Sequence, residues 1–123
     1  MKRVLIIDDS PSVLRLLQFV FESEHYDVVT AADGAEGLQK IGEQLPDVVI
    51  TDSIMPVMDG FAFLRKLKEQ PLTSHIPVIM LTSEDPDSSD QITREPKPDA
   101  FIRKSADFTP LLNKVSAALG TPR

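Results

Sequence analysis

The stretch VLIIDDSP, residues 4–11, decides the fold, because it joins four consecutive apolar residues to two neighbouring carboxylates. A continuous apolar run is typical of a strand that is covered on both faces, as in a parallel sheet flanked by helices. The Ser10-Pro11 pair predicts that a helix begins directly afterwards, with Ser10 as its N-cap and Pro11 in its first turn. The stretch therefore predicts a buried strand, a turn that carries Asp8 and Asp9, and a helix.

Comparable apolar runs recur along the 123 residues and alternate with helical patterns. The expected strands are Val4–Ile7, Val28–Ala31, Val48–Thr51, Val78–Leu81 and Ala100–Ile102. The expected helices begin at Ser10-Pro11, cover Ala35–Gln44 and Asp59–Gln70, and begin once more at Thr109-Pro110. Strands that alternate with helices predict an α/β fold, a doubly wound (βα)5 flavodoxin-like sandwich. Its five-stranded parallel sheet is expected in the common order 2-1-3-4-5.

The segment SEDPDSSDQITREPKP, residues 83–98, is the least regular part of the pattern. It contains one strongly apolar residue, Ile92, so a helix here would be short, about Asp87 to Arg94. Pro96 and Pro98 block its continuation and favour extended backbone before them. We therefore expect an irregular fourth helix and a short, mobile or reshaped surface.

The bulk composition narrows the class of protein. With 13 basic and 19 acidic residues the net charge is −6, which argues against a broad basic surface for nucleic acid. The chain has no cysteine, which excludes disulfides and thiolate metal ligands and fits a reducing compartment. No apolar segment is long enough to span a membrane, and the N-terminus does not read as a signal peptide. We expect one cytoplasmic domain over residues 1–123, binding neither nucleic acid nor membrane.

Polar residues follow four of the expected strands at the point where each strand ends. Asp8 and Asp9 follow the first strand, and Asp52, Thr82 and Lys104 follow the third, fourth and fifth. The carboxyl ends of parallel strands meet at one edge, so these side chains are expected to converge. Clustered acids raise one another's pKa unless a cation is bound, and Mg²⁺ prefers oxygen ligands. An aspartate beside such an ion can attack a phosphoryl group, so the pattern predicts a magnesium-dependent phosphoryl site.

The sequence resembles the receiver domains of bacterial two-component response regulators over nearly its whole length. The stretches that carry the resemblance are IIDDS (6–10), TDSIMPVMDG (51–60), IMLTS (79–83) and FIRK (101–104). The resemblance implies that Asp52 accepts a phosphoryl group. It also implies that Asp8, Asp9 and Asp52 hold Mg²⁺ together with the backbone carbonyl of Ile54.

The same resemblance implies a switch and a signalling role. Thr82 and Lys104 would contact the phosphoryl group, and the aromatic ring of Phe101 would follow Thr82 inward after phosphorylation. The implied protein is a stand-alone response regulator in a phosphorelay, phosphorylated by a histidine kinase or histidine phosphotransfer protein. It would signal through a phosphorylation-dependent contact with a downstream protein target. It would not be an enzyme beyond its own phosphorylation and autodephosphorylation.

The first helix carries an expected partner surface. Phe19 lies off the apolar stripe of this helix, Leu16 lies at its edge, and Arg15 is nearby. In the family this helix helps to dock the kinase or phosphotransfer helices. The resemblance therefore implies that Arg15, Leu16 and Phe19 contact the partner.

Two departures from the family pattern keep an alternative open. The irregular segment 83–98 is one, and the second is Lys104-Ser105, where the family usually has Lys-Pro joined by a cis peptide bond. A non-proline cis bond costs about 3 kcal/mol, so we expect either a trans bond with a shifted Lys104 or a retained cis bond. The alternative function is a receiver-like interaction module that works without phosphorylation. A flavodoxin-like flavin protein is disfavoured because Asp8 and Asp9 would repel its phosphate, and a phosphatase because Ile54 stands where a second Asp is needed.

Simpler roles exist for several of these residues. Asp8 or Asp9 would on this view only cap the first helix, Asp52 would open an Asx turn, and Phe101 would only pack in the core. Ser10 already supplies a cap, which favours the metal site for the two acids.

Overall fold

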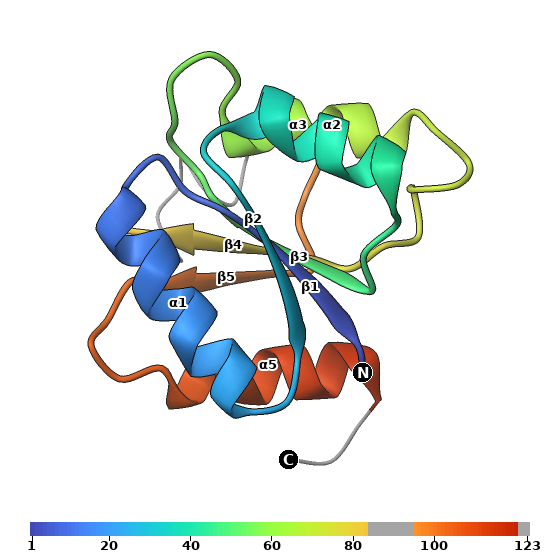
Figure 1. The fold of residues 1–123 in the computed structure, drawn as a ribbon. Coiled ribbons are helices and arrows are strands. Elements are labelled where there is room, and N and C mark those ends of the chain that lie inside the picture. Colours follow the sequence, from blue (N-terminus) through green and yellow to red (C-terminus); the bar gives the residue numbers. More distant parts are fainter. Residues whose placement is uncertain (84–94, 121–123) are drawn as a thin grey trace.

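The computed structural model describes residues 1–83 and 95–120, and the described residues form one parallel sheet (Figure 1). Its strands are β1 (Arg3–Ile7), β2 (Asp27–Ala31), β3 (Val48–Asp52), β4 (Val78–Thr82) and β5 (Ala100–Arg103). Their order is β2-β1-β3-β4-β5, which confirms the predicted order. The described helices are α1 (Pro11–Ser23), α2 (Gly34–Glu43), α3 (Gly60–Lys68) and α5 (Thr109–Leu119). The helix expected near Asp87–Arg94 lies outside the described residues.

Three of the described helices begin at a side chain that caps their N-terminus. The side chains of Ser10, Asp33 and Asp59 each accept a hydrogen bond from the backbone N–H three residues further on, at 3.3, 2.8 and 2.8 Å. Pro11 and Pro110 occupy the first turns of α1 and α5, where a missing N–H costs nothing. Within the described part of the chain no helix has the length and apolarity needed to cross a membrane.

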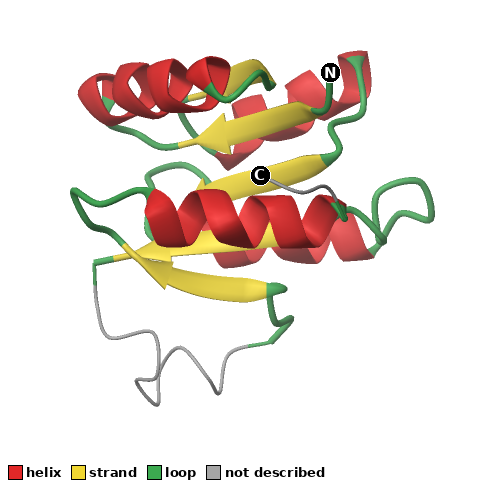
Figure 2. Cartoon of the chain, turned by 90° about the horizontal axis from the view of Figure 1, so that it is seen from below, coloured by secondary structure: helices red, strands yellow, loops and turns green. Residues whose placement is uncertain are grey.

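The sheet separates two apolar layers, one under α2 and α3 and one under α1 and α5 (Figures 1 and 2). In β3, Val48 and Ile50 belong to the α1–α5 layer, whereas Val49 belongs to the α2–α3 layer. Successive side chains of a strand point to opposite faces. Thr51 therefore continues the row of Val49, and Asp52 continues the row of Ile50. This alternation decides which residues meet at the end of the sheet.

One face of α3 is buried, with one addition. Phe61, Leu64 and Leu67 form a buried apolar stripe at helical spacing, and Phe63 is also fully buried although it lies outside that stripe. Its ring lies against Gly37 of α2, where an added Cβ would stand 3.1 Å from Phe63 Cε1. The helix therefore packs on α2 as well as on the sheet, and the absent side chain at Gly37 makes room for the second contact.

Candidate functional site

The carboxyl edge of the sheet brings three carboxylates together. Asp8 follows β1, and Asp52 is the last residue of β3, the strand beside β1. Asp8, Asp9 and Asp52 each offer an oxygen, and these oxygens all lie within 4.8 Å of one another. Asp8 and Asp52 are buried, whereas Asp9 is exposed. The cluster is therefore buried on the side of the sheet and reaches solvent through Asp9.

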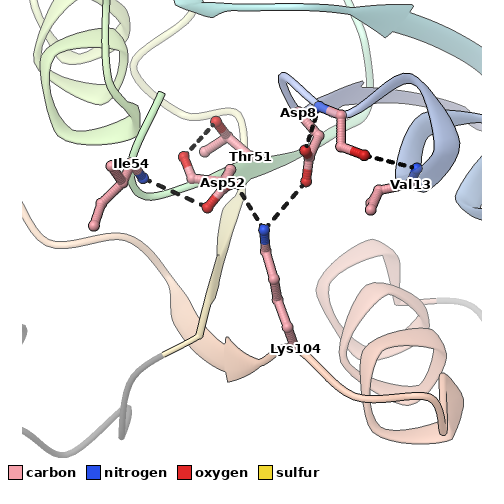
Figure 3. A network of polar contacts seen from close by, with 7 residues as sticks. Asp8, Val13, Thr51, Asp52, Ile54 and Lys104 are labelled. Atoms are coloured by element: carbon pink, nitrogen blue, oxygen red, sulfur yellow. Dashed lines mark hydrogen bonds and ion pairs between the residues drawn. The ribbon is translucent and has the colours of Figure 1, made fainter. Parts of the chain in front are cut away.

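Lys104 reaches this cluster from the loop after β5 (Figure 3). Its Nζ atom stands 2.8 Å from Asp52 Oδ2 and 3.5 Å from Asp8 Oδ2. The side chain is one-third exposed, at 33%. The Lys104 amine therefore lies between two buried carboxylates, and the exposed third of the side chain faces solvent.

The peptide bond after Lys104 is trans. Among the described residues the cis peptide bond is Glu95–Pro96. Of the two alternatives expected for Lys104-Ser105, the trans bond is the one found. The Lys104 amine nevertheless remains in the site. The backbone N–H of Lys104 donates to the Thr82 carbonyl at 2.8 Å, which keeps the residue aligned with the end of β4.

The turn roles considered for the two buried acids are present, but each uses only one oxygen. Asp8 Oδ1 accepts from the Ser10 N–H at 2.9 Å, and Asp52 Oδ1 lies 3.5 Å from the Ile54 nitrogen, at the long limit of a hydrogen bond. The Oδ2 atom of each acid faces Lys104 instead. Turn formation therefore accounts for the Oδ1 atom of each carboxylate, and the Oδ2 atoms belong to the cluster around Lys104.

Burial disfavours the charged form of Asp8. Burial raises the pKa of the Asp8 carboxyl, and the Ser10 N–H and the Lys104 charge only partly offset this. For Lys104, burial lowers the pKa, but the hydrogen bond and charge of Asp52, together with Asp8, outweigh it and raise the pKa. The lysine is therefore held in its charged form, whereas the cost of burying the Asp8 charge is only partly offset.

The donor set fits a hard divalent cation. Asp8 Oδ2 is buried and has no hydrogen-bond partner among the described residues, and Lys104 Nζ at 3.5 Å is too distant to satisfy it fully. Asp9 and Asp52 supply further carboxylate oxygens at the distances given above, and oxygen donors of this kind suit Mg²⁺. Ile54 follows Asp52 by two residues with its side chain 65% exposed, and the role of its carbonyl oxygen stays a prediction.

Replacing Asp8 with Asn is expected to raise the free energy of unfolding by about 1 kcal/mol in metal-free buffer at neutral pH. Because the pKa of Asp8 is raised, the stability that this group contributes is fully present below its ordinary value of 3.8 and is lost as pH rises through the native pKa. An amide keeps the acceptor for the Ser10 N–H without the buried charge. Urea denaturation with and without Mg²⁺ measures the effect. Wild type should gain stability from Mg²⁺ and the variant much less, and a variant less stable than wild type without metal would contradict the charge crowding.

The two predicted switch residues lie on the other face of the sheet. Thr82 ends β4 and is buried at 1% exposure, on the same face as Met80 and the α2–α3 layer. Phe101 of β5 is half-buried and packs against this layer, with its ring centroid 6.0 Å from that of Phe61. The core-packing role of Phe101 is therefore real, and its movement as a switch stays a prediction.

The predicted partner surface is exposed on α1. Arg15 is exposed, and the exposed fractions of Leu16 and Phe19 are 50% and 70%. Leu16 also lines an apolar cavity of about 170 Å³ between α1 and the segment from β5 to α5, where Ile102 and Leu111 form part of the wall. Leu16 thus connects the exposed surface of α1 with a recess beside Lys104, which lines the same cavity.

Thr51 is a site residue that the sequence analysis does not single out. This residue is fully buried, and its Oγ1 donates a hydrogen bond to the Asp52 carbonyl oxygen at 3.0 Å. The signal is a hydroxyl side chain at the end of a continuous apolar run, directly before Asp52. A strand-ending threonine is so common that this signal alone did not distinguish it.

The loop from β3 to α3 is fastened at both ends by glycines. Gly60 N–H donates to the Ser53 carbonyl at 3.1 Å, and a Cβ on Gly60 would overlap the Asp52 carbonyl oxygen. Gly34 N–H of α2 donates to the Met58 carbonyl at 3.2 Å, and a Cβ on Gly34 would stand 2.8 Å from that oxygen. The loop beside the acids is therefore held against both α3 and α2.

Known proteins share this sequence and geometry. A family model described as the response regulator receiver domain matches residues 4–116. PleD of Caulobacter vibrioides, a response regulator, is 45% identical over 83 residues, which cover 68% of this chain but 18% of PleD. PilH of Pseudomonas aeruginosa is 33% identical over 119 residues, covering 97% of this chain and 98% of PilH. The chain thus spans less than a fifth of PleD and nearly all of PilH.

A solved structure places a ligand in a related protein. The response regulator TrrA of Thermotoga maritima, in complex with Mg²⁺ and BeF, superposes with a TM-score of 0.86 at 31% identity. The match covers 97% of this chain and 100% of that one. The similarity concerns the fold throughout, including the edge where the acids of this chain meet.

Proposed function

The chain belongs to the response regulator receiver family, and from this premise we propose that it takes up a phosphoryl group on Asp52 and signals through a phosphorylation-dependent contact with another protein. The proposed donor is a histidine kinase or a histidine phosphotransfer protein, and the proposed setting is the cytoplasm. One observation carries the proposal: the buried Asp52 carboxylate lies 2.8 Å from Lys104 Nζ and within 4.8 Å of two further carboxylates. A cation site and a nucleophile therefore coincide.

The proposed reaction is an in-line transfer to the Asp52 carboxylate. A carboxylate oxygen forms a bond to phosphorus while the bond from phosphorus to the donor's imidazole nitrogen breaks, and that nitrogen keeps the electron pair. Mg²⁺, held by Asp8, Asp9, Asp52 and the Ile54 carbonyl, would neutralise the charge on the phosphoryl oxygens when bound. Lys104 already carries the opposite charge at 2.8 Å and exchanges its bond to Asp52 for one to the phosphoryl group. Hydrolysis of the acyl phosphate by water returns the free carboxylate.

The signalling step rests on the opposite face of the sheet. The Thr82 hydroxyl would turn toward the new phosphoryl oxygens, and the half-buried ring of Phe101 would follow into the space beside it. Phe101 lies on β5, at the edge of the sheet, so its movement would change a surface that a downstream target can contact.

The wild-type chain tests the proposal directly. The chain is incubated with acetyl phosphate, with Mg²⁺ or with EDTA, and its intact mass is measured. A phosphoryl adduct that forms with Mg²⁺ and not with EDTA is the expected result. If no adduct forms, and beryllofluoride with Mg²⁺ leaves the amide spectrum unchanged, the phosphorylation-independent interaction module becomes the better account.

Phe19→Ala is expected to slow phosphotransfer from a phosphohistidine protein by about tenfold and to leave labelling by acetyl phosphate at the wild-type rate. The ring is 70% exposed, so its loss removes contact area with a protein donor without disturbing the core. The two rates are measured side by side by radiolabel transfer and by intact mass. Equal slowing of both reactions, or of neither, would contradict a partner role for Phe19.

A further inference from the structure

Thr51 places a buried hydroxyl on an apolar face. Its neighbours across the sheet are Ile7 of β1 and Met80 of β4, and both belong to the apolar layer under α2 and α3. Thr51 itself has no exposed surface. Burying a hydroxyl is unfavourable unless it is hydrogen-bonded, whereas a valine of the same shape would fit this position without that demand. The hydroxyl therefore calls for an explanation beyond packing.

The hydrogen bond of this hydroxyl fixes the peptide group that carries the acceptor. Thr51 Oγ1 donates to the Asp52 carbonyl oxygen at 3.0 Å (Figure 3). The N–H of the same peptide group, on Ser53, donates to the Leu81 carbonyl at 3.1 Å. Gly60 lies against the same oxygen closely enough that no Cβ could be accommodated. The Asp52–Ser53 peptide is thus held at its oxygen, at its nitrogen and by steric contact.

The orientation of this peptide is passed on to the carboxylate. Two side-chain torsions connect the Asp52 carboxylate to the backbone. Its oxygens must meet Lys104 on one side and the Ile54 N–H on the other. A tilt of the peptide plane moves both oxygens relative to Lys104, which is fixed through its own backbone bond to Thr82. Misplacement of a reacting group by about 1 Å can lower a rate by about a hundredfold.

We infer that Thr51 is a positioning residue for phosphoryl transfer: its hydroxyl orients the Asp52 peptide so that the carboxylate is aligned for attack. The inference rests on the proposed function, because it assigns Thr51 a role in that reaction. It differs from a role in folding, since the contacts of the Thr51 side chain with Ile7 and Met80 would be supplied equally well by an apolar residue.

Two substitutions separate the hydroxyl from the shape of the side chain. Thr51→Val keeps the shape and removes the hydrogen bond, and Thr51→Ser keeps the hydroxyl and removes a methyl group. The matched control is Thr73→Val, because Thr73 is also buried and its hydroxyl also donates to a backbone carbonyl, that of Leu67 at 2.7 Å, away from the acids. For each variant the initial rate of adduct formation with acetyl phosphate and Mg²⁺ is measured by intact mass, and stability is measured by urea denaturation.

Thr51→Val should form the adduct at least about tenfold more slowly than wild type, and its urea midpoint should fall no further than that of Thr73→Val, which also leaves a buried backbone carbonyl without its hydroxyl donor. Thr51→Ser should recover the rate to within about threefold even though it loses packing, so the rate does not follow stability in these variants. Thr73→Val should lose stability and keep the rate.

Each other outcome overturns the inference. A wild-type rate in Thr51→Val would show that the hydroxyl does not position the carboxylate. Should Thr51→Val fail to fold, a folded Thr51→Ser that is as slow as a Thr51→Ala variant would show the same. An adduct on wild type with these results overturns the role of Thr51 alone, whereas no adduct on wild type overturns the proposed function and this inference together.

Discussion

Asp52→Asn is expected to reduce formation of the Mg²⁺-dependent phosphoryl adduct by at least about a thousandfold, which places it below detection by intact mass. The amide has nearly the shape of the carboxylate but lacks the charged oxygen that we propose attacks phosphorus. The fold should survive, because Lys104 keeps Asp8 as an ion-pair partner at 3.5 Å. Acetyl phosphate labelling in the presence of Mg²⁺ measures the effect directly.

The matched control for this variant is Asp47→Asn. Asp47 is exposed at the opposite edge of the sheet, where it accepts from the Arg3 N–H at 2.7 Å, and an amide oxygen can keep that bond. It should be labelled at the wild-type rate. Persistence of the adduct in Asp52→Asn would mean that a different carboxylate, Asp8 or Asp9, is the acceptor, and peptide mapping of the adduct would identify it.

Lys104→Met is expected to slow adduct formation by about a hundredfold and, at the same time, to tighten Mg²⁺ binding by about threefold to tenfold. The slower rate follows because the lysine cation 2.8 Å from Asp52 is removed from the proposed phosphoryl site. The tighter metal binding follows because a competing positive charge leaves Asp8 and Asp52, so the acids depend more on an added cation. The rate is measured by intact mass and the affinity by isothermal titration calorimetry.

The opposite signs of these two effects distinguish chemistry from damage to the fold, since a misfolded site would lose both. The matched control is Lys114→Met, because Lys114 is exposed on α5 and should affect neither quantity. An unchanged labelling rate in Lys104→Met would remove the lysine from the mechanism. Weaker Mg²⁺ binding would show that the amine supports the metal site instead of competing with it.

Much of the fold was predictable because strong local signals agree with one another. The continuous apolar runs, the Ser10 cap and the two prolines in first turns place the described helices and strands to within two residues of where they are found. The convergence of Asp8 and Asp52 followed from a rule of topology, since parallel strands end at the same edge. None of these steps needed the position of a single side chain.

What the sequence could not reveal depends on contacts between elements. A continuously apolar strand does not show which of its residues faces which layer. The placement of Thr51 and Asp52 on opposite faces of the sheet, and the hydrogen bond between them, were therefore not predicted. Phe63 lay outside the apolar stripe of α3 because its contact is with α2 at Gly37, and helical periodicity describes only the face toward the sheet. The reach of Lys104 depended on the peptide bond after it, which the Ser105 departure left open between two geometries.

Positions in and around the loop between β3 and α3 should differ in how well they tolerate substitution. At Gly34 and Gly60 any side chain would meet backbone oxygen, so changes there would move the acceptor strand or separate α2 from the loop. Ile54 and Val57 lie between these anchors with 65% and 83% of their surface exposed, and Val57 holds a φ of 68° that glycine adopts more easily. Those two positions can therefore be altered from the solvent side, next to the acceptor, without repacking the interior. The rates of the proposed gain and loss of a phosphoryl group at Asp52 should therefore be tunable by substitution at these two positions.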